Sequence, residues 1–229
     1  MRTPVVDYRT FRISKLNDPQ FSHLKLLYGW VGYFVLFFLT ENLIPEEKCH
    51  PVHCWLDDVI PFNEIFLIPY VFWYVLIVIS LLYFLLYDVE SFKSLQTFII
   101  ITQVVAMAAY IIWPSRQDLR PIVFPRDNFL TQCVGLLYSV DTNTGVCPSL
   151  HVAYSLGIAS VWLKNKTLSK FWRIPWKMFV VIAVILICLS TMFIKQHSAV
   201  DFFAALPVCL LAEMIVYGRK YWRSRFRRV

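Results

Sequence analysis

Residues 65–87 read IFLIPYVFWYVLIVISLLYFLLY, a stretch without a single charged side chain. About 20 residues of this kind in a helix cross the roughly 30 Å hydrocarbon core of a bilayer. The rest of the chain is similar: 58% of its residues are hydrophobic and 16% are charged, whereas soluble domains carry about 25% charge. The sequence therefore predicts an integral membrane protein, and its length suits one domain.

Six stretches of this kind predict an all-α, six-transmembrane-helix bundle. The fourth is short unless its helix begins inside the polar segment before it, which we expect. Residues 1–25 precede the spans in 26–218, and a basic tail, 219–229, follows them. The predicted spans are about 26–44, 65–87, 97–113, 149–163, 178–194 and 199–218.

The basic residues predict the topology, because Lys and Arg are enriched in cytoplasmic loops. Of the 22 Lys and Arg, 17 fall in the N-terminal segment, the second and fourth loops and the tail, and 5 fall in the other loops. Both termini are therefore expected in the cytoplasm. The net charge of +7 is then explained by topology and anionic lipid headgroups, and no nucleic-acid partner is expected.

Two polar segments begin apolar spans, CPSLH at 147–151 and KQHSAVD at 195–201, and this topology places both on the extracytoplasmic face. Ionisable groups there are costly and mark functional sites. His197 and Asp201 share a helix face, so the carboxylate can hold one imidazole nitrogen and leave the other free to attack. His151 is placed to act as a general acid. These three are the predicted catalytic residues.

The same face offers groups that bind an anion. The amides of Leu150 and His151 lack helical partners and carry the positive end of the helix dipole, and Ser149 adds a hydroxyl. Arg120, in the preceding outer loop, and Lys195 supply positive charge. We expect a phosphoryl-binding site of Arg120, Ser149, Leu150 and Lys195, with a phosphohistidine intermediate and no metal or cofactor required.

These residues resemble the motifs of the type 2 phosphatidic acid phosphatase (PAP2) superfamily, membrane lipid phosphatases related to vanadium haloperoxidases. The resemblance covers about residues 113–201 and implies His197 as nucleophile, Asp201 as its partner and His151 as acid. It also implies Arg120 and Ser149 as phosphate ligands, and a PAP2-like helical core. The matching residues are Arg120 and Pro121, then Pro148, Ser149 and His151, then Ser190, His197 and Asp201.

The chain departs from the family pattern where Trp113 replaces Lys, Leu150 replaces Gly and Thr191 replaces Arg. Two of the cationic phosphate ligands of the family are therefore missing. The Pro-Ser-Leu-His form is similar to the branch that includes inositol phosphorylceramide synthases, which transfer a headgroup phosphate to a lipid alcohol. Both water and an alcohol fit as acceptors of the phosphoryl group. Analogy with small six-span members of the superfamily, which are mostly phosphatases, favours water and therefore hydrolysis.

Two other segments call for an interpretation. The sequence CHPVHC at 49–54 has ligand types that suit zinc, but its spacing is unusual for a zinc site, and a disulfide between Cys49 and Cys54 is favoured on an oxidising face. Cys133 and Cys147 are a second possible pair.

Residues 129–140 are apolar but too short to span a membrane, and we expect them to form an interfacial helix that roofs the site.

The sequence thus predicts a multi-pass membrane enzyme, a lipid phosphate phosphatase that acts at the extracytoplasmic face. Its expected partners are a lipid phosphate substrate and membrane lipids. The alternatives are a phosphotransferase that moves a phospho-headgroup to a lipid alcohol and a non-catalytic lipid-binding protein. The second alternative is disfavoured because His197 and Asp201 are both present.

Overall fold

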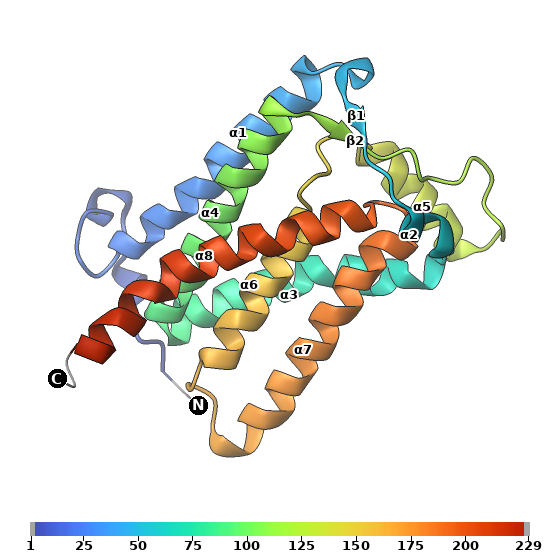
Figure 1. The fold of residues 1–229 in the computed structure, drawn as a ribbon. Coiled ribbons are helices and arrows are strands. Elements are labelled where there is room, and N and C mark those ends of the chain that lie inside the picture. The colour runs from blue at the N-terminus through green and yellow to red at the C-terminus, as the bar shows by residue number, and fades with distance from the viewer. Residues whose placement is uncertain (1–2, 227–229) are drawn as a thin grey trace.

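The computed structural model describes residues 3–226, with side chains described up to residue 218. Figure 1 shows a bundle of helices with a small parallel strand pair, β1 (His50–Pro51) and β2 (Ser115–Arg116), at one end. The longer helices are α1 (Tyr28–Leu43), α3 (Leu67–Tyr87), α4 (Val89–Ile112), α5 (Phe129–Val140), α6 (Leu150–Lys164), α7 (Lys170–Phe193) and α8 (Ala199–Phe226). The shorter helices are η1 (Tyr8–Thr10), η2 (Ile13–Lys15), η3 (Ser22–Leu27), η4 (Glu46–Lys48), α2 (Trp55–Val59) and η5 (Glu64–Phe66).

The described residues form five helical segments that are long and apolar enough to cross a membrane. A largely helical chain with several candidate spans is thereby confirmed. The predicted fourth span corresponds to α6, whose 15 residues rise only about 22 Å. The count of six spans therefore stays a prediction. The five segments are Ser22–Leu43, Glu64–Tyr87, Val89–Ile112, Lys170–Phe193 and Ala199–Gly218.

Two predicted starts were wrong, because the helices that contain these spans begin earlier. α4 begins at Val89 and not near residue 97, because Asp88 caps its first turn by accepting a hydrogen bond from the Ser91 backbone N at 3.1 Å. α7 begins at Lys170, about two turns before residue 178, so charged residues lie in its first turns. The predicted sixth span, 199–218, coincides with the candidate span Ala199–Gly218, and the helix α8 continues beyond it to Phe226. The side chains of the predicted basic tail, 219–229, lie outside the described part of the chain.

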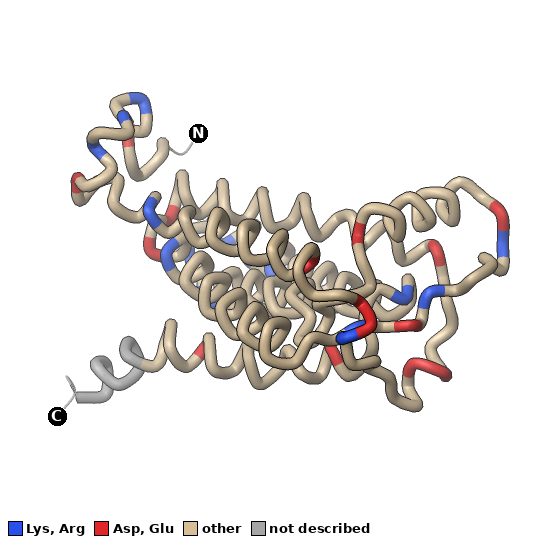
Figure 2. Tube along the Cα trace, turned by 90° about the horizontal axis from the view of Figure 1, so that it is seen from above, with Lys and Arg blue, Asp and Glu red and all other residues tan. Residues whose placement is uncertain are grey.

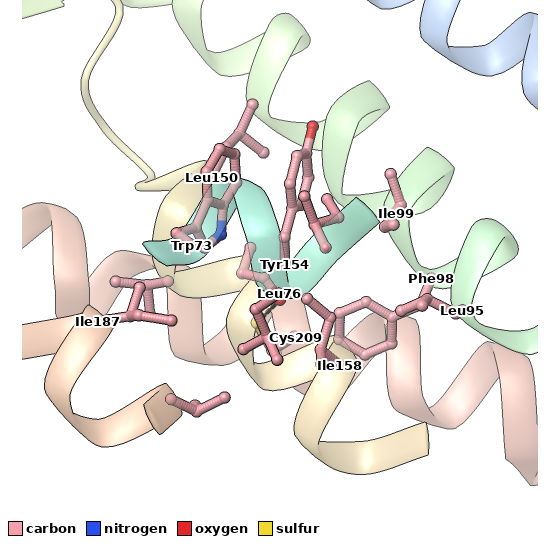
Figure 3. Packing of buried hydrophobic residues seen from close by; sticks show 14 of the residues in the cluster. Trp73, Leu76, Leu95, Phe98, Ile99, Leu150, Tyr154, Ile158, Ile187 and Cys209 are labelled. Atoms are coloured by element: carbon pink, nitrogen blue, oxygen red, sulfur yellow. Dashed lines mark hydrogen bonds between the residues drawn. The ribbon is translucent and has the colours of Figure 1, made fainter. Parts of the chain in front are cut away.

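The core is built around α6, which packs against α3, α4, α7 and α8. Figure 3 shows Tyr154 and Ile158 of α6 among apolar side chains from these neighbours. Gly157 permits the close approach of α4, since a β-carbon at this position would lie 2.6 Å from the Phe98 ring. A central, buried α6 fixes the position of its first turn, where the CPSLH segment ends.

Charged and apolar residues are separated along the bundle. Figure 2 shows Lys, Arg, Asp and Glu gathered mostly toward the two ends, with largely uncharged turns between them. The N-terminal turns and the C-terminal part of α8 lie at one end, and α2, α5 and the strand pair lie at the other (Figure 1). α5 has the bounds predicted for the interfacial helix, and it exposes Phe129, Leu136 and Val140.

Candidate functional site

His197 and Asp201 meet where α7 turns into α8. His197 Nδ1 lies 3.2 Å from Asp201 Oδ2, and the same oxygen accepts a hydrogen bond from the Ser198 backbone N at 3.0 Å. Asp201 is fully buried, and its Oδ1 has no hydrogen-bond partner among the described residues. Because a carboxylate faces Nδ1, we assign the proton of the neutral imidazole to this nitrogen. Nε2 then carries the lone pair.

His151, in the first turn of α6, lies beside the free nitrogen of His197. Its Nδ1 is 3.4 Å from His197 Nε2. The ring is packed against two aromatic side chains of α3, with centroids 4.7 Å from Tyr70 and 4.4 Å from Trp73. Its Nε2 is buried and has no partner in the described part of the chain. The three predicted catalytic residues therefore form one row from Asp201 through His197 to His151.

The N-terminus of α6 leaves backbone donors open at this row. Ser149 caps the helix, since its Oγ accepts from the Val152 backbone N at 3.4 Å, and its own N donates to the Asp201 carbonyl at 3.1 Å. Within residues 3–226, the amides of Leu150 and His151 have no hydrogen-bond acceptor. Two open amides at a helix N-terminus form a site for an anion. Ser149 itself is fully buried behind them.

Arg120 lies close to the site but its guanidinium is bound to the protein. Nη1 donates to the Tyr138 carbonyl, and Nη2 donates to the carbonyls of Asp141 and Thr142. Nη2 also donates to Gln196 Oε1 at 2.6 Å, so one side chain separates Arg120 from His197. The predicted phosphate ligand is thus a neighbour of the catalytic row and holds the loop after α5 in place.

Lys195 faces away from the catalytic row. Its Nζ donates to the carbonyls of Asp57, at 2.8 Å, and Ile60. Burial lowers the pKa of this ammonium, and the nearby carboxylates of Asp57 and Asp58 oppose the shift. In this arrangement Lys195 anchors the segment that carries His197 to the segment 57–60.

Asp57 completes the same anchor and was not singled out from the sequence. Its Oδ2 accepts from Ser198 Oγ at 2.6 Å, and its Oδ1 accepts from the Ala199 backbone N at 2.7 Å. Oδ2 also accepts from the Cys54 backbone N, so Asp57 is buried at the start of α2 and caps α8. The N-terminus of α8 is therefore filled by a carboxylate of the protein, whereas that of α6 is open.

Trp113 and Thr191 stand at the two positions where the PAP2 pattern has a cationic residue, and both side chains contact other parts of the protein. The Trp113 ring stacks on His50 with centroids 5.2 Å apart, and Thr191 Oγ1 donates to the Cys188 carbonyl at 2.9 Å. The Thr191 carbonyl accepts from the backbone N of Gln196 and of His197, which shapes the turn before α8. Neither side chain offers a positive charge to a ligand.

All six cysteines are free thiols, so the expected disulfide between Cys49 and Cys54 is absent from the structure. In the described part of the chain, no cluster of His, Cys, Asp or Glu could hold a metal ion. Cys147 lies at the site. Burial, reinforced by the Asp201 carboxylate, raises the pKa of its thiol to about 12, so the thiol stays protonated at neutral pH.

A cavity of about 520 Å³ opens onto this row. His151, His197 and Leu150 line it together with aromatic side chains of α1 and α3. Asp141 and Gln196 form part of its polar wall, and neither is among the site residues predicted from the sequence. Gln196 lies inside the KQHSAVD segment, next to a predicted catalytic histidine, whereas no sequence motif marks Asp141.

Comparison with known proteins gives one partial match. A stretch of 86 residues is 40% identical to part of a PA-phosphatase related-family protein of Dictyostelium discoideum. The match covers 37% of this chain and 14% of the relative, so the chain spans a small part of that protein. No family model matches the chain, and no solved structure matches it. The match supports a PAP2-like relationship and does not address the inositol phosphorylceramide synthase branch.

Proposed function

We propose that this chain is a membrane enzyme of the lipid phosphatase type, which cleaves a phosphoester bond of a lipid through a covalent phosphohistidine. The observation that carries the proposal is the row Asp201, His197 and His151, whose two histidines line a cavity beside two open amides of α6. A nucleophile, its orienting carboxylate, an acid and an anion site are the groups that such a reaction needs.

In the first step, the lone pair on His197 Nε2 forms a bond to phosphorus. The bond between phosphorus and the lipid oxygen breaks, and this oxygen takes a proton from the imidazolium of His151. The amides of Leu150 and His151 hold the non-bridging oxygens, where negative charge gathers. Asp201 stabilises the positive charge that develops on His197.

In the second step, His151 is neutral and accepts a proton from water. The water oxygen attacks phosphorus, the bond from nitrogen to phosphorus breaks, and its electron pair returns to Nε2. An alcohol in place of water would give headgroup transfer. The apolar walls of the cavity are compatible with this alternative acceptor, because they can hold the tail of a lipid alcohol after the first product has left. Reaction at the extracytoplasmic face, with both termini cytoplasmic, belongs to the same proposal.

The test is turnover by the purified full chain in lipid nanodiscs. A panel of lipid phosphomonoesters and phosphodiesters is supplied with and without alcohol acceptors, and free phosphate, phospho-headgroup and new lipids are followed. We expect His197→Gln to abolish turnover. His53→Gln is the matched control, because His53 lies in the first outer loop and its contact with Asp58 joins two exposed side chains. Full turnover in His197→Gln contradicts the proposal.

A further inference from the structure

The cavity beside the two histidines has an apolar arm and a polar rim. The arm follows α3 from Trp73 to Leu81, about 12 Å along the helix axis, and α1 contributes further aromatic side chains to it. The polar rim consists of Asp141, Thr142, Thr144 and Gln196. A lipid with phosphorus at His197 then has its tail in the arm and its headgroup at the rim.

The charge of the rim is negative. Asp141 lines the cavity, and its Oδ2 accepts from Gln196 Nε2 at 3.3 Å, next to His197. Behind the rim, Glu41 accepts hydrogen bonds from the hydroxyls of Thr142 and Thr144. Among the described residues, the cavity wall contains no Lys or Arg.

The nearest guanidinium, that of Arg120, is bound to residues of the rim but does not line the cavity. Its two terminal nitrogens donate to three backbone carbonyls and to Gln196, so both are already engaged within the protein. A second phosphate group at the rim would meet the carboxylate of Asp141, and no Lys or Arg of the described cavity wall would balance the charge of the phosphate. A positively charged group at the rim would meet the carboxylate of Asp141.

Aromatic side chains near Asp141 also favour a positively charged group at the rim. Tyr33 and Phe37 of α1, Tyr74 of α3 and Tyr110 of α4 line the same cavity as Asp141. Aromatic rings attract cations through their negative faces, and quaternary ammonium groups are recognised in this way. Building on the proposed function, we propose that the substrate is a phosphodiester lipid with an amine headgroup, of the choline or ethanolamine type, whose cation binds at Asp141 and these rings.

Such a lipid would react in the same two steps as in the proposed function. His197 Nε2 bonds to phosphorus, and the bond to the glycerol oxygen breaks. The glycerol oxygen takes the proton from His151 and leaves as diacylglycerol, while the phosphoamine headgroup stays on His197. Water or an alcohol then releases the headgroup, and Nε2 recovers its electron pair.

The experiment compares three lipids with identical acyl chains in nanodiscs: phosphatidylcholine, phosphatidylglycerol and phosphatidate. Diacylglycerol release by the full chain is measured for each. We expect phosphatidylcholine to be preferred. In Asp141→Asn, the ratio of kcat/KM for phosphatidylcholine to that for phosphatidylglycerol should fall about tenfold, the size of a desolvated cation contact. Asp127→Asn, a change at an exposed position in the same outer loop, should leave this ratio unchanged.

The outcomes separate the two proposals. Diacylglycerol release that depends on His197 but shows no preference for the amine headgroup overturns this inference and leaves the proposed function standing. An unchanged ratio in Asp141→Asn also overturns the inference. Release from none of the three lipids and from no other phosphoester of the wider panel overturns both.

Discussion

His151 is distinguished at the residue scale by its position between His197 and the aromatic rings of α3. If it protonates the leaving oxygen, its loss matters most for leaving groups that need a proton. We expect His151→Ala to lower kcat by about 10²- to 10⁴-fold for a lipid alkoxide, and much less for a nitrophenol leaving group. Rates on both substrates are measured with the purified variant. Equal losses on both substrates contradict the acid role.

Asp141 gives a pH dependence with a defined sign. Burial raises the pKa of this carboxyl above its ordinary value of 3.8, and the charges of His197 and Arg120 oppose the shift. The Asp141 carboxylate also accepts hydrogen bonds from Tyr70 and Gln196, and the carboxylate of Glu41 is near enough to interact with it. The carboxylate is charged above the raised pKa and neutral below it, so the preference for a choline headgroup should fall as pH falls through that raised value.

The choline group keeps its charge at every pH, so the change reports on Asp141. The selectivity ratio between phosphatidylcholine and phosphatidylglycerol is measured against pH for the wild type and Asp141→Asn. The ratio in the variant should be low and flat. A ratio that changes with pH equally in both proteins contradicts the assignment.

The site residues differ in how far sequence alone could place them. His197 and Asp201 follow from helix periodicity, because residues four apart share a face whatever the rest of the fold does. The side chains of Arg120 and Lys195 donate hydrogen bonds to backbone carbonyls of segments distant in the sequence. Long side chains reach partners that only the tertiary structure brings near, so their sequence positions did not fix their contacts.

At the scale of elements, the start of α8 depends on α2. Asp57 accepts two hydrogen bonds from the first residues of the α8 segment, and both are buried. We expect Asp57→Ala to lower the free energy of unfolding by about 2 to 3 kcal/mol, since charge-assisted bonds and a helix cap are lost. It should also lower kcat, because His197 is one residue from Ser198.

Thermal unfolding in detergent and turnover of the variant test this role. Asp58→Ala is the control, since the Asp58 side chain is 69% exposed and its contact with His53 is at the surface. Loss of stability equal to that of the control contradicts the anchoring role of Asp57.

The contact between α4 and α6 gives a second element-scale prediction. Gly157→Ala places a methyl group against the rigid Phe98 ring, and we expect a loss of about 1 to 3 kcal/mol in unfolding free energy. Gly32→Ala in α1 has no atom within 4 Å of the added carbon and should be neutral or stabilising. Thermal unfolding of both variants in one detergent checks the difference, and equal effects would count against this packing.

Helix boundaries show what a hydropathy pattern leaves out. The apolar centres of α3 and α4 are plain in the sequence, but Asp88 alone separates these two helices. Polar residues in the first turns of α4 and α7 read as loop because the pattern reports burial and not backbone conformation. The bounds of α5 agreed with expectation because Asn128 caps its start through a hydrogen bond from the Thr131 backbone N.

At the scale of the whole molecule, α6 is the central helix, and its first turn meets the segment before α8. Three features fix the position of this turn relative to the segment before α8. They are the buried Gly157, the Ser149 cap and the hydrogen bond from the Ser149 backbone N to the Asp201 carbonyl. Composition predicted a membrane bundle and the motifs predicted two histidines at one face. The cavity between α1, α3 and α6 required the tertiary packing, because its walls come from segments far apart in the sequence.

The central claim is that His197 carries the phosphoryl group between the two steps. Purified protein is mixed with a labelled lipid phosphoester, quenched under conditions that preserve phosphohistidine, and mapped by peptide mass spectrometry. We predict a transient phosphorus adduct on His197 that is absent from folded His197→Gln. Turnover without an adduct, or an adduct on any other residue, would contradict the account.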